Sequence, residues 1–299
     1  MAPSHFFKLP AMIRLNFSIE LNYDIYDSGS DFIFNIHAAT TPHQNVVHEQ
    51  LHVSQDVRST IFTVPETGSR YLRLQAGNGP LCVRYEAAVE ITHHTEDTAN
   101  LQEMAIDQVP PHALAYIYPS RYCQSDRLHN LASREFGGWQ RGYQRVLAIQ
   151  DWIRQRVMFQ SGSTNASTSA LDTILEQVGV CRDYAHLMIA LCRAVNLPAR
   201  FVTGIDYGVD QTQRALDFHA YVEVMLSGRW YLFDPSGVSP PMGLVRIGTG
   251  RDAVDVPFAT VFGAVNPALP LITINAVSDA AQGLVLPFHT DQALSSAIV

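Results

Sequence analysis

Hydrophobic and polar residues alternate along the first third of the chain. Between residues 13 and 20, apolar side chains fill the odd positions and polar side chains fill the even ones. This two-residue period is typical of a β-strand with one buried face. Apolar-rich runs also cover residues 32–36, 46–53 and 81–91, and breaks containing Gly or Asn separate the runs. We therefore predict that residues 12 to about 91 form an antiparallel sandwich or an open barrel.

The segment after these strand patterns is polar and then rich in proline. Residues 92–107 are mostly polar, and Val109-Pro110-Pro111 follows them, as is typical of a linker. We place a domain boundary here. Residues 1–105 are then expected to form an N-terminal all-β domain, and residues 106–299 a second domain.

Beyond this linker the spacing of apolar residues changes to three and four. One such stretch covers residues 143–159 and predicts a helix with one buried face. Ser169 and Asp172 have the spacing of a capping box, in which an acidic side chain reaches back to the start of its own helix. They predict a short helix over residues 170–177.

The strongest helical pattern begins at Cys181. Its apolar residues recur at helical spacing as Ala185, Met188, Ile189, Cys192 and Val195. Pro198 ends the helix, because proline bars the residue before it from helical geometry. Gly179 interrupts the pattern just ahead, so we expect Cys181 in the first turn. There, unpaired N–H groups and the helix dipole favour a thiolate over a thiol and could hold an oxyanion. A lone cysteine is nevertheless more often a small buried side chain.

Several strand patterns follow this helix. They cover residues 200–207, 218–226, 230–233, 244–247 and 271–274, and a polar loop occupies residues 208–216. The second and third patterns are separated by a Ser-Gly pair at 227–228 and a single arginine. We interpret them as a β-hairpin.

The expected hairpin brings a histidine and an aspartate together. If Ser227-Gly228 is a two-residue turn, the strand register places Asp234 opposite Tyr221. His219 shares a face with Tyr221, because strand side chains alternate. Asp234 then becomes the diagonal neighbour of His219, within reach of a hydrogen bond. A three-residue loop would turn Asp234 to the other face. We predict the two-residue turn and the hydrogen bond.

Cys181, His219 and Asp234 together supply what a cysteine nucleophile requires. A base must share the thiol proton, and a carboxylate must orient that base and stabilise its charged form. The surrounding residues resemble the transglutaminase-like superfamily over about residues 143–236. The resemblance is carried by Gly179-Val180-Cys181-Arg182-Asp183-Tyr184-Ala185-His186, Phe218-His219-Ala220-Tyr221-Val222-Glu223-Val224, Trp230-Tyr231-Leu232-Phe233-Asp234-Pro235-Ser236 and, more weakly, Pro198-Ala199-Arg200-Phe201-Val202-Thr203-Gly204.

The resemblance implies an α+β fold and a reaction. The fold is a papain-like core, with the nucleophile helix packed on an antiparallel sheet, after the N-terminal β domain that bacterial members carry. Cys181 would be the nucleophile, His219 the base and Asp234 its orienting partner. The implied substrate is a peptide or protein, whose peptide, isopeptide or carboxamide carbonyl forms a thioester before the acyl group passes to water or an amine. We favour water, because amine transfer requires a special acceptor pocket.

Two alternatives remain open from the sequence. The chain could be a binding or assembly module with an unused triad and the β domain as its interaction surface. Cys181, His219 and Asp234 could instead hold zinc, since these residue types are zinc ligands. We expect no cofactor or metal. The calcium dependence of animal transglutaminases is not carried over, because no acidic, oxygen-rich loop is present.

Composition narrows the choice of partners. The chain has 299 residues and a formal net charge of -8, and its Lys and Arg residues are scattered. This pattern argues against nucleic acid or an anionic membrane as the main partner. No apolar run approaches the roughly 20 residues of a membrane helix. The N-terminus lacks the apolar block of a signal peptide, so we expect a cytoplasmic protein.

The remaining candidate side chains are assigned no chemistry. The four cysteines have no close pairs, which argues against a zinc framework or a disulfide scaffold. We expect Cys82 to be a solvent-exposed thiol, Cys192 to be inert core, and Cys123 to have no role. Asp183 is expected to stabilise the first turn of its helix, and His186 to be structural.

Overall fold

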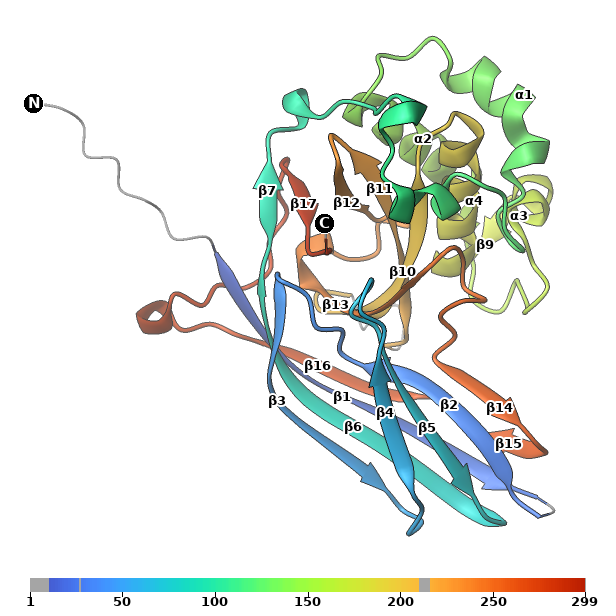
Figure 1. Cartoon of the computed structure of the whole chain (residues 1–299), viewed down its shortest axis with the longest axis vertical. Coiled ribbons are helices and arrows are strands. Elements are labelled where there is room, and N and C mark those ends of the chain that lie inside the picture. The colour runs from blue at the N-terminus through green and yellow to red at the C-terminus, as the bar shows by residue number, and fades with distance from the viewer. Residues whose placement is uncertain (1–10, 27, 210–215, 299) are drawn as a thin grey trace, which may run out of the picture.

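The described part of the chain, residues 11–26, 28–209 and 216–298, contains two antiparallel sheets built mainly from N-terminal strands, a third antiparallel sheet and a group of helices. In the computed structural model the helices lie beside the third sheet, and the N-terminal sheets lie beyond it (Figure 1). Residues 210–215 of the expected polar loop and the first ten residues lie outside the described residues. No described helix combines the length and apolar character needed to cross a membrane.

The long N-terminal strands form the first of the two N-terminal sheets. β1 (Met12–Ile25) pairs along its whole length with β6 (Gly79–Thr92), and β3 (Gln44–Val53) pairs with β6 on its other side. Ile13 lies opposite Ile91, and both are fully buried. The odd residues of β1 from Ile13 to Ile25 are all buried, which confirms the two-residue period.

The second N-terminal sheet completes a sandwich. Its order is β14 (Ala259–Phe262), β2 (Ser30–His37), β5 (Arg70–Ala76) and β4 (Ser59–Thr63). Buried residues of both sheets belong to one core cluster, so the sheets pack face to face. The sandwich prediction is confirmed.

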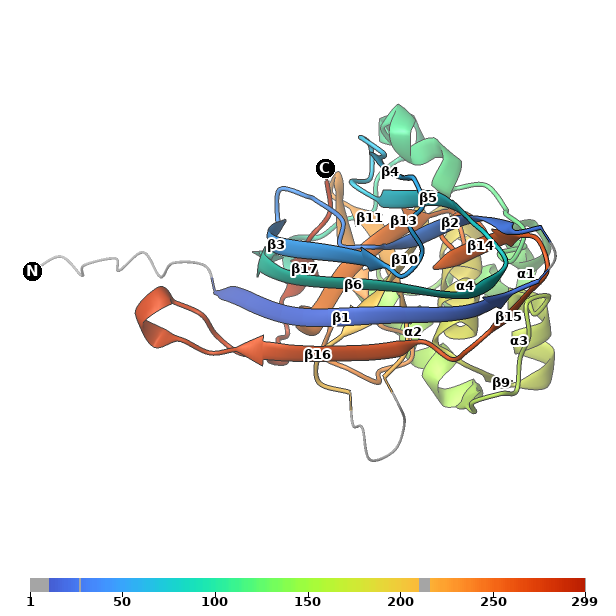
Figure 2. The same cartoon turned by 90° about the horizontal axis from the view of Figure 1, so that it is seen from below.

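Three strands from the tail of the chain lie in these N-terminal sheets. β15 (Val265–Pro267) and β16 (Leu271–Val277) both pair with β1, and β14 pairs with β2. Figure 2 shows β16 running beside β1. Without them the backbone groups along one edge of β1 would be unpaired. The division at residue 105 stays a prediction, but these tail strands, which it assigned to the second domain, complete the sheets of the first.

The third sheet carries the predicted hairpin. Its order is β12 (Arg229–Phe233), β11 (His219–Leu226), β10 (Ala199–Asp206) and β13 (Leu244–Gly250). Ile205 and Val245 of this sheet belong to the core cluster of the N-terminal strands. The two units therefore share a hydrophobic core.

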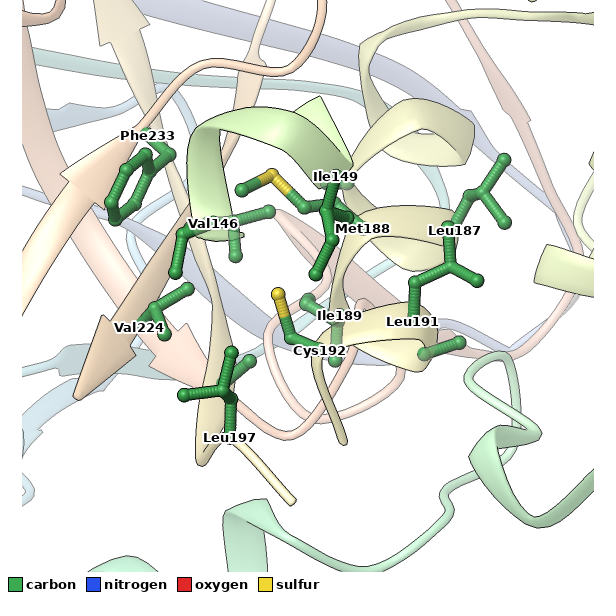
Figure 3. Close-up of a cluster of buried hydrophobic side chains, with 14 of the residues drawn as sticks. Val146, Ile149, Leu187, Met188, Ile189, Leu191, Cys192, Leu197, Val224 and Phe233 are labelled. Carbon is green, nitrogen blue, oxygen red and sulfur yellow. The ribbon is translucent and has the colours of Figure 1, made fainter. Parts of the chain in front are cut away.

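Helices pack against the third sheet. They are α1 (Ser125–Phe136), α2 (Tyr143–Arg156), α3 (Ala170–Glu176) and α4 (Cys181–Ala194). α4 is almost entirely buried, and Figure 3 shows its Cys192 among apolar side chains such as Ile149, Leu197 and Val224. α4 ends before Pro198 as predicted, and Asn196 has a positive φ of 65° there. A buried helix that begins at Cys181 and packs on an antiparallel sheet confirms the expected fold class.

Short elements connect these layers. They are β7 (His94–Glu96) paired with β17 (Ala293–Ser295), β8 (Met158–Phe159) paired with β9 (Val178–Gly179), and the 3-10 helices Thr98–Asn100, Ile106–Gln108, Pro111–Tyr116, Pro241–Gly243 and Ala280–Gln282. The expected linker is therefore partly ordered into β7 and 3-10 turns. Gln102 within it exchanges hydrogen bonds with Ser227 of the hairpin turn.

Candidate active site

Cys181 is the first residue of α4 and is half-buried. The Val180 N–H donates to Asp183 Oδ2 at 2.9 Å, which closes the first turn of the helix. A Cβ on Gly179 would come within 2.8 Å of the Asp183 Cβ, so the residue two before the cysteine has to be small. The expectation that Asp183 stabilises this turn is confirmed. The sulfur consequently lies where a helix presents free N–H groups.

His219 is the first residue of β11 and is buried. Its neighbour Phe218 brings the strand close to Cys181, since the Phe218 carbonyl oxygen lies 3.9 Å from Cys181 Sγ. The Nδ1 atom of His219 has no hydrogen-bond partner in the described part of the chain. The edge of the ring packs on Tyr221, with ring centroids 4.6 Å apart. The imidazole is thus enclosed and held against its own strand.

The hairpin register is the one predicted. Leu226 pairs with Arg229 and Val222 pairs with Phe233, so Ser227-Gly228 forms a two-residue turn. Both turn residues have positive φ, 48° and 81°, as a type I′ turn requires. Asp234 follows directly after the last paired residue, on the face that carries His219. The His219 Nε2 to Asp234 Oδ1 distance is 3.4 Å, which confirms the predicted hydrogen bond.

The Asp234 carboxylate is fixed by its own turn. Its Oδ1 accepts hydrogen bonds from the Ser236 N–H at 2.9 Å and the Ser236 hydroxyl at 2.6 Å, and its Oδ2 accepts one from the Val238 N–H at 3.1 Å. The Arg154 guanidinium of α2 donates to the carbonyl oxygens of Asp234 and Pro235. Helix α2 thereby anchors the backbone that carries the carboxylate.

A second carboxylate, which our sequence analysis did not single out, lies beside His219. Asp206 is the last residue of β10 and is buried, and its Oδ2 lies 3.5 Å from His219 Nδ1. Gly204 pairs directly with His219, so Asp206 is the diagonal neighbour of the histidine on the other flanking strand. The sequence signal for Asp206 was the alternation of side chains along its strand, which fixes the face on which Asp206 lies. This signal relates Asp206 to His219 only when the β10–β11 register is known, and the long connection between these two strands leaves that register undetermined.

These groups shift one another's ionisation. Burial alone would lower the pKa of His219, but Asp206, Cys181 and Asp234 raise it, and the pKa lies well above its usual value. Burial would raise the pKa of Asp234, but the His219 charge and the Ser236 hydrogen bonds hold it below its usual value. The site therefore favours a charged imidazole beside an ionised Asp234.

The other cysteines and His186 lie outside this arrangement. Cys123 and Cys192 are fully buried, and burial raises the pKa of both thiols, that of Cys123 to about 12. Cys82 was expected to be exposed, but it is half-buried on β6, and burial raises its pKa as well. His186 is buried, stacks on Tyr122 and accepts a hydrogen bond from the backbone, as a structural residue would.

The described residues contain no group of three or more His, Cys, Asp or Glu side chains arranged to hold a metal ion. Cys181, His219 and Asp234, the residues of the zinc alternative, all belong to the described part of the chain. These side chains, together with Asp206, are suited to acid–base chemistry at sulfur, since a thiol, an imidazole and two carboxylates meet at one end of the third sheet.

Comparisons with known proteins agree with this arrangement. Residues 130–235 match the transglutaminase-like superfamily, and residues 13–112 match the bacterial transglutaminase N-terminal domain. A crystal structure of a candidate cysteine protease from Cytophaga hutchinsonii has a TM-score of 0.87 and 37% sequence identity, covering 95% of this chain and 97% of that one. The chain belongs to the transglutaminase-like superfamily.

More distant relatives have no assigned activity. An uncharacterised protein of Mycobacterium leprae (strain TN) is 32% identical over 117 residues, which is 37% of this chain and 41% of that protein. One from Mycobacterium tuberculosis (strain ATCC 25618 / H37Rv) is 32% identical over 116 residues, which is 33% of this chain and 35% of that protein. The chain thus spans about two fifths or less of these curated relatives.

Proposed function

We propose that this chain is a cysteine-dependent hydrolase or acyltransferase that acts on peptide, isopeptide or carboxamide bonds, with Cys181, His219 and Asp234 as its catalytic triad. One observation carries the proposal. A buried histidine is hydrogen-bonded to a fixed carboxylate and lies beside a cysteine at the first turn of a helix. Membership of the superfamily supports the same reaction class.

The reaction follows from the proton positions. Asp234 holds the His219 Nε2 proton, which leaves Nδ1 to exchange a proton with the Cys181 sulfur. The thiolate attacks the carbonyl carbon, and the free N–H groups of the first helical turn stabilise the oxyanion. The imidazolium then protonates the leaving amine, the C–N bond breaks, and a thioester forms. Water or an amine attacks this thioester and gives a proton back to His219, and the thiolate leaves.

We favour water as the acceptor. Our reason is the one given by the sequence, since transfer to an amine has to exclude water and requires an acceptor pocket of its own. Mass spectrometry of products formed with and without an added primary amine distinguishes the two outcomes. A product that carries the amine would replace hydrolysis by transfer within the same thioester mechanism.

Profiling with a library of peptide amides and an acyl probe tests the proposal. Wild type should release the amine and label at Cys181, and Cys181→Ala should do neither. Cys192→Ala serves as the matched control, because it removes a buried thiol of the same helix and should keep labelling. A folded wild-type chain whose Cys181 takes no probe would overturn the proposal in favour of a binding module with an unused triad.

A kinetic test separates the role of His219. Iodoacetamide should alkylate Cys181 near neutral pH, and the rate should drop in His219→Ala because the imidazolium no longer stabilises the thiolate. Half-buried Cys82 is an internal reference, since its labelling should not depend on His219. If Cys181 and Cys82 were alkylated at equal rates, and these rates did not change in His219→Ala, a Cys181 thiolate–His219 imidazolium pair would be excluded.

A further inference from the structure

The end of β10 places a carboxylate where the triad does not require one. Asp206 is buried, and its Oδ2 accepts a hydrogen bond from the Ser239 hydroxyl at 2.8 Å. That hydroxyl also lies 2.8 Å from the Tyr221 hydroxyl. Asp206 Oδ1 has no hydrogen-bond partner within residues 11–26, 28–209 and 216–298, and neither has His219 Nδ1. Two buried polar atoms without partners cost stability, so their retention calls for a reason.

The two carboxylates are arranged symmetrically about the ring. Asp234 lies 3.4 Å from Nε2 and Asp206 lies 3.5 Å from Nδ1, from the strands on either side of β11. An asparagine at 206 could accept the same hydrogen bond from Ser239 without a buried charge. A carboxylate is favourable here only if a cation lies beside it, since an isolated buried charge is costly. His219 is the cation within reach.

We propose that Asp206 is a positioning residue that, together with Asp234, holds His219 in its charged form and so keeps the Cys181 sulfur ionised. This inference rests on the proposed function, because it assigns Asp206 a role in the same Cys181–His219 pair. In the part of the chain that the structure describes, the titratable groups that face His219 are Cys181 from α4, Asp206 from β10, Tyr221 from β11 and Asp234 after β12. Tyr221 is neutral, because burial raises its pKa well above the usual value.

The ionisation of the two partners is reciprocal. Burial raises the pKa of Asp206, and the His219 charge lowers it. The carboxylate therefore stays ionised most readily while the imidazole is charged, and the imidazole keeps its proton most readily while the carboxylate is ionised. Removal of the carboxylate should return the proton from His219 toward the sulfur.

The rate of Cys181 alkylation by iodoacetamide near neutral pH tests this inference. In Asp206→Asn this rate should fall by up to about tenfold, because a nearby opposite charge contributes about one pKa unit or more to His219 and its loss leaves less of the imidazolium–thiolate pair. Ser239→Ala is the matched control, because it breaks the hydrogen bond to Asp206 but keeps the charge, and its rate should match that of wild type. An unchanged rate in a folded Asp206→Asn chain would reduce Asp206 to a structural anchor for Ser239.

A second measurement covers the case in which Asp206→Asn does not fold. In Cys181→Ala/Asp234→Asn, Asp206 is the only carboxylate of the described residues left against the ring. Proton NMR should show the His219 imidazole still mostly charged at pH 7, and a ring that titrates below its usual value of about 6.5 would overturn the inference. Failure of the proposed function is distinct, because His219→Ala would then leave wild-type alkylation unchanged.

Discussion

The two carboxylate oxygens of Asp234 have different hydrogen-bond partners, and an amide side chain cannot satisfy both sets. Oδ1 faces His219 and Ser236, and Oδ2 accepts the Val238 N–H. An asparagine offers one oxygen and one NH2 group, so one of these sides would oppose donor to donor. If the NH2 group faces Nε2, the imidazole loses its preferred tautomer and the stabilisation of its charged form.

Asp234→Asn should therefore keep the fold and lose activity. We expect a fall of about 10²- to 10⁴-fold in kcat on a peptide-amide substrate, with an unchanged circular dichroism spectrum. Asp255→Asn is the control, because that carboxylate pairs with exposed Arg251 and should leave turnover intact. Full activity in Asp234→Asn would remove this carboxylate from the mechanism.

At the residue scale the sequence identified part of this arrangement. The His219–Asp234 hydrogen bond was predictable because a two-residue turn determines the register of its hairpin. Asp206 was not, because its strand reaches β11 through a connection that is not a tight turn. The roles of Cys181, His219 and Asp234 stay predictions until they are tested.

At the element scale, the proposed chemistry depends on the hairpin turn, because the turn sets the strand register that brings Asp234 to His219. One glycine inserted between Ser227 and Gly228 would make a three-residue loop and turn Asp234 to the opposite face. We expect loss of turnover with the secondary-structure content retained, as turnover assays and circular dichroism would show. The same insertion at Gly283, where the surroundings are open, is the matched control. Wild-type turnover in the hairpin insertion would mean that the register does not control the site.

Two elements that the sequence analysis missed, β4 and α1, each lack one local signal. β4 is exposed at every position, so an edge strand of this kind has no buried face and no alternation to detect. α1 begins after Gln124 without a side-chain cap, and the residues before it look like a turn. α4 and the long strands were predictable because their buried faces produce clear periods.

For the whole molecule, buried histidines should make the fold sensitive to acid. Burial lowers the pKa of His37 and of His93 to about 4, and that of His186 well below its usual value. The unfolded chain, with histidine pKa values near 6.5, then binds more protons than the folded chain between about pH 4 and 6.5. Stability therefore falls as the pH falls through this window, by up to about 3 kcal/mol for each of His37 and His93.

Urea unfolding at pH 7 and pH 5 measures this effect. Wild type should lose free energy of unfolding between the two pH values, and His37→Phe should lose less, because phenylalanine fills the site against Tyr85 without a titrating group. The salt bridge between Asp255 and exposed Arg251 offers the control Asp255→Asn, which should follow wild type. Parallel pH dependence in His37→Phe would contradict the assignment.

The arrangement of the tail strands could not be predicted from the sequence. Periodicity indicates that residues 271–274 form a strand, but it cannot say which edge the strand joins. The pairing depends on β1, which has one edge paired with β6 and the other edge paired with β16. Pairing between distant segments leaves no local trace in either of them.

The same pairing determines the order in which the protein can mature during synthesis. A ribosome makes β1 well before β16, so the nascent N-terminal sheet has one unpaired edge while the helices and Cys181 emerge. Contacts between such distant segments form slowly, and an unpaired edge in the meantime invites association with other chains. Since the two units also share a core through Ile205 and Val245, the sheet that carries His219 is expected to reach its final packing only when the N-terminal sheets are complete. Activity and completion of the fold are therefore expected to begin together.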